Sequence, residues 1–475
     1  MPSTCQAAQT KTQDPTDSPE TAGLLLHRFG AADLGEGNLT VGANVLAAMA
    51  LVVEGLRRPG SRVELANGTT IEPRGGCLVS GGLASAMVVD KVLSPLRAKQ
   101  AAFQYHHECW RRHMMKAARN PDKETDTSSP SRLDGTPLLS ELDKTDDGSG
   151  YGRFTRRAGL LVQPAERMDF ESRERPIFFA TVAAPGDIDR LMPFGHAGRM
   201  LVHVPINDPS GFARFGGPIV RLLDGVHLGP GHLEASGDVI STDVHAILGG
   251  AVADGTAENS WPARLPWLVE TCPEARFVPA ADSNVRKIGC VNAMFESAVD
   301  RVLLARLAPA AGPGQRECQF SHHWQTIWIR LLRKLEPACP GIAGALRPLL
   351  VSLMAGLYEI CKDPALPNRA AGSIDPLEVL AFAGLLARRM VAFRQRHLRD
   401  MREAERKRLI MWILTILSEG PRSVRDLTRR KHRLSADTCR DALQHLLTTG
   451  AVACDGRAWI LTNNHSPSHE SCVQV

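Results

Sequence analysis

The sequence predicts an α/β core, a helical region after it, and a small C-terminal module of three helices and a hairpin. Three short apolar runs, at 77–80, 177–183 and 200–204, end near turn-forming residues and are separated by helical or loop segments. Such alternation favours an α/β sheet. From 295 to 397 the apolar residues recur mainly at helical spacing, which predicts a helical subdomain.

Shifts in composition predict where the parts of the chain begin and end. The segment 120–150 is rich in Asp, Ser, Thr, Pro and Gly, which is typical of a flexible insertion, and another strand is expected at 159–163. The expected organisation is a disordered tail at 1–22, the α/β core at 23–294, the helical subdomain at 295–398, the C-terminal module at 399–463 and a second tail at 464–475.

Composition places the chain among ordinary globular proteins. It has 475 residues, 43% hydrophobic and 23% charged, with a net charge of +5, so nucleic-acid affinity would need a local basic patch. Eleven scattered cysteines argue against a disulfide framework and favour a reducing cytosol. A polar N-terminus without an apolar signal region, and apolar runs well short of about 20 residues, predict a cytoplasmic protein without a membrane role.

The first part of the core is expected to contain two helices and a hairpin. Apolar residues surround the segment 41–56, as in a buried helix, and Pro59-Gly60 follows it. Asn67-Gly68 favours a hairpin turn. A long amphipathic helix is expected from about Ala84 to Ala118, with a break at Pro95.

A Gly-Gly turn joins the strand at 77–80 to this long helix, in the stretch LVSGGLASAMVVDKVL at 78–93. Backbone N–H groups at such a turn can hold a phosphate. The candidate nucleotide-binding residues are Ser80, Gly81, Gly82 and Ser85. A P-loop also needs a lysine and a hydroxyl residue, and Ala86 and Met87 occupy those positions here. Lys91, more than one helical turn further on, is interpreted as a surface charge.

The C-terminal module reads as helix, short helix, helix and two strands around an Asp-Gly turn, which is the order of a winged helix. Ser423 and Ser435 are positioned to cap the second and third helices. The third helix would enter the major groove of DNA, and basic residues before it would contact phosphates. The candidate DNA-binding residues are Arg425, Arg429, Arg430, Lys431, Arg433, Arg440 and Gln444. Asp437 and Asp441 on the third helix would repel phosphate, and a packing or protein-binding module stays open.

Three segments occur in a particular order along the chain. The Gly-Gly turn leads into the charged helix with Trp110, GLLVQPAERMD follows at 159–169, and IFFATVAAPGDIDRLMPFGHAGRML follows at 177–201. From about Thr40 to Thr462 the chain thereby resembles the uncharacterised helicase- and primase-like P-loop proteins of bacteria, phages and plasmids. That family is similar to RecA-type ATPases, so the resemblance implies a RecA-like core.

The resemblance also implies roles for single residues. The family's acidic pair corresponds to Ala165 and Glu166. Ala165 thus replaces the magnesium-binding aspartate, whereas Glu166 retains the glutamate. Thr181 takes the position of a polar sensor and Arg199 that of a catalytic arginine. Because the lysine, the hydroxyl and the aspartate are missing, ATP and magnesium would lack their main ligands. We therefore expect a degenerate member with little or no ATP hydrolysis, serving a mobile element or genome maintenance by binding DNA or partner proteins. A second copy of the chain is a further candidate partner.

Other interpretations of the turn remain open. SGGLAS at 80–85 is similar to the pyrophosphate loop of adenylating enzymes, although Ala84 replaces an aspartate. A serine hydrolase at Ser80 lacks one glycine of the usual motif. The turn is also compatible with close packing of strand and helix without a ligand. An active nucleotide-dependent enzyme with an atypical loop, and a non-enzymatic interaction scaffold, are therefore the alternative functions.

No metal site is expected. The pairs His106-His107 and His322-His323 consist of adjacent residues, which diverge on a helix and do not form a chelating face. Asp187 and Asp189 could act as catalytic carboxylates, but helix capping explains them more simply.

Overall fold

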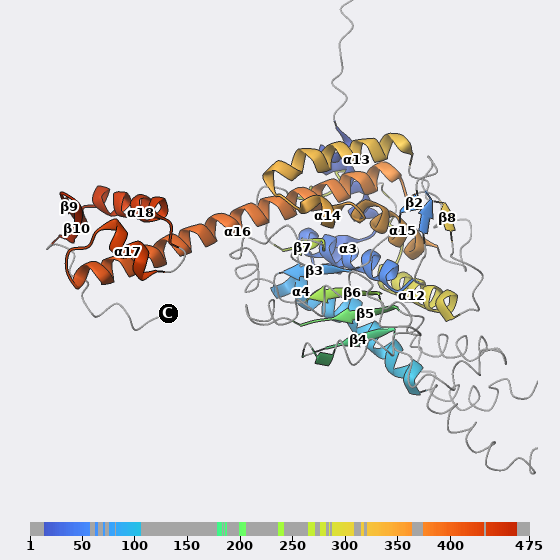
Figure 1. Cartoon of the computed structure of the whole chain (residues 1–475). Helices are drawn as coiled ribbons and strands as arrows, with labels where there is room; N and C mark the ends of the chain where they lie inside the picture. Colours follow the sequence, from blue (N-terminus) through green and yellow to red (C-terminus); the bar gives the residue numbers. More distant parts are fainter. Residues whose placement is uncertain are drawn as a thin grey trace, which may run out of the picture. The chain divides into compact units, whose positions relative to one another are not determined.

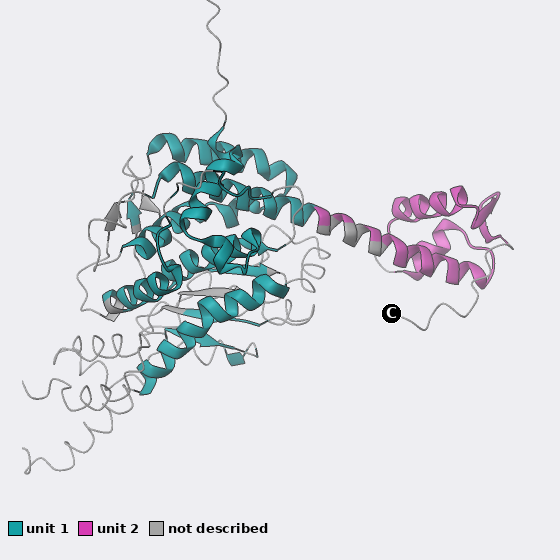
Figure 2. Cartoon of the chain, turned by 180° about the vertical axis from the view of Figure 1, so that it is seen from behind, with its two compact units in different colours: residues 1–395 teal, residues 396–475 magenta. Residues whose placement is uncertain are grey.

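The chain divides into two compact units, residues 1–395 and 396–475 (Figure 2). The structure is a computed structural model. It describes residues 14–57, 62–64, 70–71, 76–80, 82–105, 178–182, 184, 186–187, 199–205, 236–241, 265–270, 276–281, 285, 287–307, 315–317, 321–362, 374–431 and 434–462.

A buried helix lies at the centre of the first unit. The short helices η1 (Pro15–Asp17), α1 (Pro19–Arg28) and α2 (Ala31–Leu34) lead to α3 (Leu39–Gly55), which is buried from Val41 to Gly55. Asn38 caps α3 by accepting hydrogen bonds from the backbone nitrogens of Thr40 and Val41, at 3.0 and 3.2 Å. The helix predicted at 41–56 corresponds to α3.

A five-stranded sheet lies against α3 (Figure 1). Its strands are β3 (Cys77–Ser80), β4 (Phe179–Thr181), β5 (Arg199–His203), β6 (Ser236–Ser241) and β7 (Trp267–Val269). They lie in the order β4-β5-β6-β3-β7, and each neighbouring pair is parallel. The carboxyl ends of all five strands therefore lie at one edge. Three of the strands match predicted ones, the strand expected at 159–163 lies outside the described residues, and β6 and β7 were not predicted.

A smaller sheet joins two distant segments. β1 (Arg62–Glu64) pairs antiparallel with β2 (Thr70–Ile71), as expected for the hairpin around Asn67-Gly68, and parallel with β8 (Gln315–Glu317).

The helix after β3 does not break at Pro95. α4 (Gly82–Val88) continues into a π-helical turn, η2 (Val89–Leu93), and helical structure then extends to residue 105. Proline lacks a backbone N–H and its ring collides with the preceding turn of an α-helix. The wider π turn directly before Pro95 accommodates both effects, so the predicted break is wrong.

The helical region contains α12 (Val291–Leu307), α13 (His322–Leu335), the 3₁₀ turn η9 (Glu336–Ala338), α14 (Ile342–Leu346) and α15 (Leu349–Cys361). Pro348 separates α14 from α15, and both helices lie in the region expected to be helical. α15 packs against α3, and a Cβ on Gly356 would lie 2.1 Å from the carbonyl oxygen of Ala50. Glycine at this position is therefore needed for the close approach of the two helices.

α16 (Pro376–Ser418) is a single helix of 43 residues. The expected boundary between the helical subdomain and the C-terminal module, at 398/399, lies inside this helix. No Gly or Pro interrupts α16 between 385 and 418, so the helix continues across the boundary between the two units at 395/396.

One stretch of the described residues passes a length and composition test for a membrane span. It runs from Ile342 to Cys361, has a mean hydropathy of 1.3, and is 78% buried inside the protein. The same test is passed by buried core helices.

The second unit has its own hydrophobic core. The end of α16 packs with α17 (Val424–Arg430), α18 (Ala436–Thr448), β9 (Val452–Asp455) and β10 (Ala458–Leu461) around Leu409, Ile413, Leu417, Leu427, Leu443, Leu446 and Val452. As predicted, Ser423 and Ser435 cap α17 and α18. Gly456, with φ of +62°, lies in the turn between the antiparallel strands β9 and β10. Leu447 is exposed, because it lies one residue past the buried stripe of α18.

The segment between α16 and α17 extends the hairpin. Arg422 and Trp459 exchange two backbone hydrogen bonds, at 3.1 and 2.8 Å, and form an antiparallel bridge. The three helices and the hairpin are therefore joined by backbone pairing as well as by side-chain packing.

Candidate functional site

The N-terminus of α4 holds a carboxylate from the protein itself. Oε2 of Glu270, the residue after β7, accepts hydrogen bonds from the backbone nitrogens of Leu83 and Ala84, at 3.2 and 3.3 Å. β7 lies directly beside β3 in the sheet, which brings Glu270 to the turn. The carboxylate satisfies two N–H groups that a helix leaves without partners and lies at the positive end of the helix dipole.

Contacts to the end of β7 fix the position of Glu270. The carbonyl oxygen of Val269 accepts hydrogen bonds from Asn44 Nδ2 at 2.9 Å and from Arg389 Nη2 at 2.5 Å. The same Nη2 lies 3.2 Å from the carbonyl oxygen of Glu270. Arg389 is buried and its guanidinium lies 5.0 Å from the ring centroid of Phe277. The glutamate is thus anchored by the core of the first unit.

The described parts of the predicted nucleotide-binding residues provide few polar side-chain groups at this turn. Gly82 is exposed, and a Cβ added to it would meet no heavy atom within 4 Å. Close packing therefore does not require glycine at 82. Ser85 is half-buried in α4. Ser80 ends β3, while its side chain and the whole of Gly81 lie outside the described residues.

A second polar cluster lies where β4 and β5 end. Thr181 and His203 are the last residues of these strands and pair in register. Arg97, on the helix that continues from α4, donates from Nε to Thr181 Oγ1 at 3.3 Å and from Nη2 to His203 Nδ1 at 3.2 Å. Thr181 Oγ1 and His203 Nδ1 are also 3.2 Å apart. Arg97 and Thr181 are exposed, whereas His203 is buried.

His203 is neutral in this environment. Burial, with a smaller contribution from the charge of Arg97, lowers the pKa of His203 from 6.5 to about 3. Because an arginine can only donate, Nδ1 accepts and the ring proton is on Nε2. Nε2 is buried and has no hydrogen-bond partner among the described residues.

Thr181 and Arg199, to which the family resemblance gave catalytic roles, lie apart from each other and from β3 in the sheet. Thr181 lies on β4, and β5 and β6 stand between β4 and β3, which corresponds to three strand spacings of about 4.8 Å. Arg199 begins β5 and therefore lies at the opposite edge of the sheet from Thr181, which ends β4. Glu166 lies outside the described residues.

Sequence reasoning missed Glu270, Arg97 and His203. A polar residue directly after an apolar run was the available signal for two of them: Glu270 follows WLV, and His203 ends RMLVH. Arg97 carries no comparable signal, because it looks like any exposed helical arginine.

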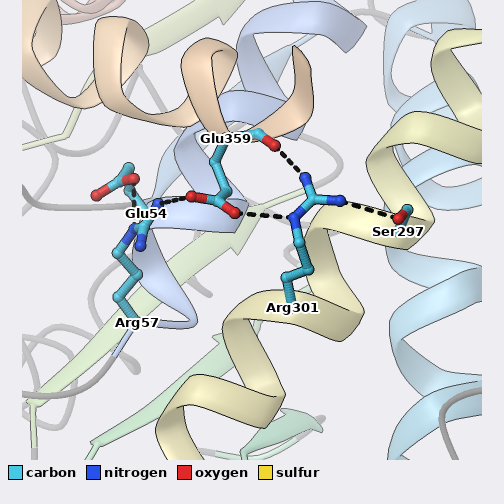
Figure 3. A network of polar contacts seen from close by, with 5 residues as sticks. All are labelled: Glu54, Arg57, Ser297, Arg301 and Glu359. Carbon is cyan, nitrogen blue, oxygen red and sulfur yellow. Dashed lines mark hydrogen bonds and ion pairs between the residues drawn. The ribbon is translucent and has the colours of Figure 1, made fainter. Parts of the chain in front are cut away.

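A network of charged groups is buried where α3, α12 and α15 meet (Figure 3). Glu359 accepts from Arg57 Nη2 at 2.9 Å and from Arg301 Nε at 3.0 Å. Arg57 also pairs with Glu54 at 2.7 Å, and Arg301 donates to Ser297 Oγ at 2.9 Å and to the carbonyl oxygen of Glu359. Burial alone would raise the pKa of Glu359, but the two arginines lower it. Every member has a protein partner, so the network is structural.

Within the described residues, no three His, Cys, Asp or Glu side chains form a potential metal site. His322 and His323 are exposed at the start of α13, while His106, His107 and Asp189 lie outside the described residues. Asp187 accepts a hydrogen bond from the backbone nitrogen of Ala184 at 3.2 Å, as expected for a capping residue.

The candidate DNA-binding residues of the second unit fall into two groups. Arg430 pairs with Glu419 at 2.7 Å and Arg440 with Asp437 at 2.5 Å. The ammonium of Lys431 lies 5.2 Å from the ring centroid of Trp412. By contrast, the exposed side chains of Arg425, Arg429 and Gln444 make no hydrogen bond or salt bridge with described residues. Arg433 lies outside the described residues.

The N-terminus of α17 also reduces the basic character of this surface. Ser423 and Asp426 form a capping box, with the carboxylate of Asp426 accepting from the backbone nitrogen of Ser423 at 3.1 Å. Hydrogen bonds from Ser423 lower the pKa of Asp426. The segment 422–433 nevertheless contains six Lys or Arg residues against this one acid.

Comparisons with models of protein families, with curated proteins and with solved structures found no match to the chain.

Proposed function

We propose that the protein binds duplex DNA through a winged helix in its second unit. We further propose that its first unit is a degenerate RecA-like core that does not turn over nucleotide. The observation that carries the proposal is the exposed pair Arg425 and Arg429 on α17, whose guanidinium groups form no salt bridge or hydrogen bond with described residues. Arginines that are not held in salt bridges are available to neutralise DNA phosphates.

The order of elements in the second unit supports the winged-helix part of the proposal. α17 and α18 follow the end of α16 and precede the β9–β10 hairpin, and the Arg422–Trp459 bridge attaches the hairpin to the segment before α17. With α18 in the major groove, Gln444 on its exposed side would reach base edges, and Arg425 and Arg429 would contact the backbone.

The α4 N-terminus supports the inactive core. A nucleotide phosphate at this turn would meet the carboxylate of Glu270, which already accepts from Leu83 and Ala84. It would also lack the lysine and the hydroxyl that a P-loop supplies. The parallel sheet with a helix starting after β3 is compatible with a RecA-like origin, and the sequence resemblance is the reason for preferring it.

The test is the affinity of the full chain for a labelled duplex, measured by fluorescence anisotropy at several salt concentrations. The double variant Arg425→Gln/Arg429→Gln should weaken binding and reduce the salt slope by about 2, one for each lost phosphate contact. The matched control is Arg406→Gln/Arg408→Gln, which removes two exposed charges from α16 in the same unit and should weaken binding much less. Equal effects of the two double variants would reject these contacts, and no affinity at low salt would favour an interaction scaffold.

A further inference from the structure

The cluster at the ends of β4 and β5 contains an arginine that is oriented by its neighbours. A guanidinium group has two edges that can each bind a planar pair of acceptors. Thr181 and His203 occupy the edge formed by Nε and Nη2 of Arg97. No described residue occupies the other edge, formed by Nη1 and the second hydrogen of Nη2.

The surroundings of Arg97 favour an anionic acceptor on that edge. No described carboxylate lies within salt-bridge distance of Arg97, and both Arg97 and Thr181 are exposed. His203 contributes no positive charge, but its buried ring holds Nη2 of Arg97 in place through a hydrogen bond. The carboxyl ends of parallel strands are the usual place for ligands in α/β sheets.

We propose that Arg97 is the centre of an oxyanion-binding site, which takes the phosphate or carboxylate group of a small molecule through a two-pronged contact with Nη1 and Nη2. Thr181 and His203 are positioning residues that hold the guanidinium. The site is separate from the α4 N-terminus, because Thr181 and His203 end β4 and β5 whereas Glu270 and α4 adjoin β7 and β3. It is also independent of the DNA-binding surface, which belongs to the other unit.

The test uses inorganic phosphate as the probe. The width of its ³¹P resonance is measured as the full chain is added. Sodium acetate then serves as a carboxylate competitor. Saturable broadening is expected. The affinity for phosphate should fall about tenfold or more in Arg97→Gln, because the variant loses two charge-assisted hydrogen bonds to the ligand. Arg406→Gln removes an exposed arginine of α16 in the second unit and should leave the broadening unchanged. Displacement of the phosphate by acetate at similar concentration would identify a carboxylate as an equally suitable group.

Two further variants separate a binding role from a structural one. Thr181→Val keeps the size of an exposed residue and removes one acceptor from Arg97, so it should weaken phosphate binding several-fold without unfolding the protein. Arg97→Lys keeps the positive charge but loses the planar two-pronged donor group. It should therefore bind phosphate more tightly than Arg97→Gln but more weakly than the wild type. Unchanged broadening in Arg97→Gln, or no broadening with the wild-type chain, would overturn the proposal. The DNA titration would be unaffected by either result, so the two proposals can fail separately.

Discussion

The carboxylate of Glu270 lies 3.2 Å from the backbone nitrogen of Leu83 and thereby closes the first turn of α4. The two residues are 187 positions apart in the sequence and meet because β7 lies beside β3 in the parallel sheet. The backbone N–H groups at the start of α4 are thus bound by a carboxylate that belongs to the fold.

Removing this carboxylate should destabilise the first unit. Glu270→Ala leaves two N–H groups of α4 without an acceptor, and we expect the free energy of unfolding to fall by about 1 kcal/mol, as for the loss of a helix cap. Glu270→Gln keeps an oxygen acceptor and should lose less. Urea denaturation followed by circular dichroism measures both. An alanine variant as stable as the wild type would show that Glu270 does not cap the helix.

The acid next to the basic surface should limit DNA affinity. Glu419 pairs with Arg430 at 2.7 Å and lies 3.6 Å from Arg422, so Glu419→Gln releases two arginines. We expect DNA binding at low salt to tighten by roughly threefold to tenfold, and the gain to shrink as salt screens the charges. Glu403→Gln is the control, because Glu403 pairs with Lys407 elsewhere in the same unit. Similar effects of the two variants in anisotropy titrations would argue against a role of Arg430 or Arg422.

The buried network around Glu359 should be essential for stability. Glu359→Ala would leave Arg57 and Arg301 without their shared acceptor, and breaking a buried ion pair from one side costs about 3–5 kcal/mol. Chemical denaturation should therefore show a large loss. Tyr358→Phe changes the exposed neighbouring residue on α15 and should alter stability by less than about 0.5 kcal/mol. A tolerated Glu359→Ala change would mean that water replaces the lost carboxylate.

Acid should weaken the first unit partly through His203. Its pKa is lowered to about 3 in the folded protein, so the unfolded chain binds a proton at higher pH than the folded chain does. The contribution of His203 to the free energy of unfolding is fully present above its ordinary pKa of 6.5. It is lost as pH falls from about 6.5 to 3, by up to about 1.4 kcal/mol per pH unit. His203→Asn keeps an acceptor for Arg97 but cannot titrate. The difference in unfolding free energy between wild type and variant should change across this window, and a constant difference would contradict the lowered pKa.

Local patterns were sufficient for several elements. The apolar run of α3, the strands β3, β4 and β5, and the caps Ser423 and Ser435 depend on nearby residues and were predicted. The continuity of the helix around Pro95 was harder to predict, because proline normally breaks a helix and the π turn that accommodates it leaves no signal in the sequence.

The candidate sites depend on longer distances in the sequence. Arg97 meets Thr181 and His203 across 84 and 106 positions, so no spacing rule could join them before the strand order was known. The resemblance gave roles to Thr181 and Arg199, but it could not reveal that they lie at opposite edges of the sheet.

The most direct test of the account is the affinity of the full chain for duplex DNA, measured with and without ATP and magnesium. The account predicts binding that weakens steeply as salt rises, is the same with and without nucleotide, and is accompanied by no ATP hydrolysis. A complete lack of DNA affinity at low salt, or an affinity that ATP changes several-fold, would contradict it.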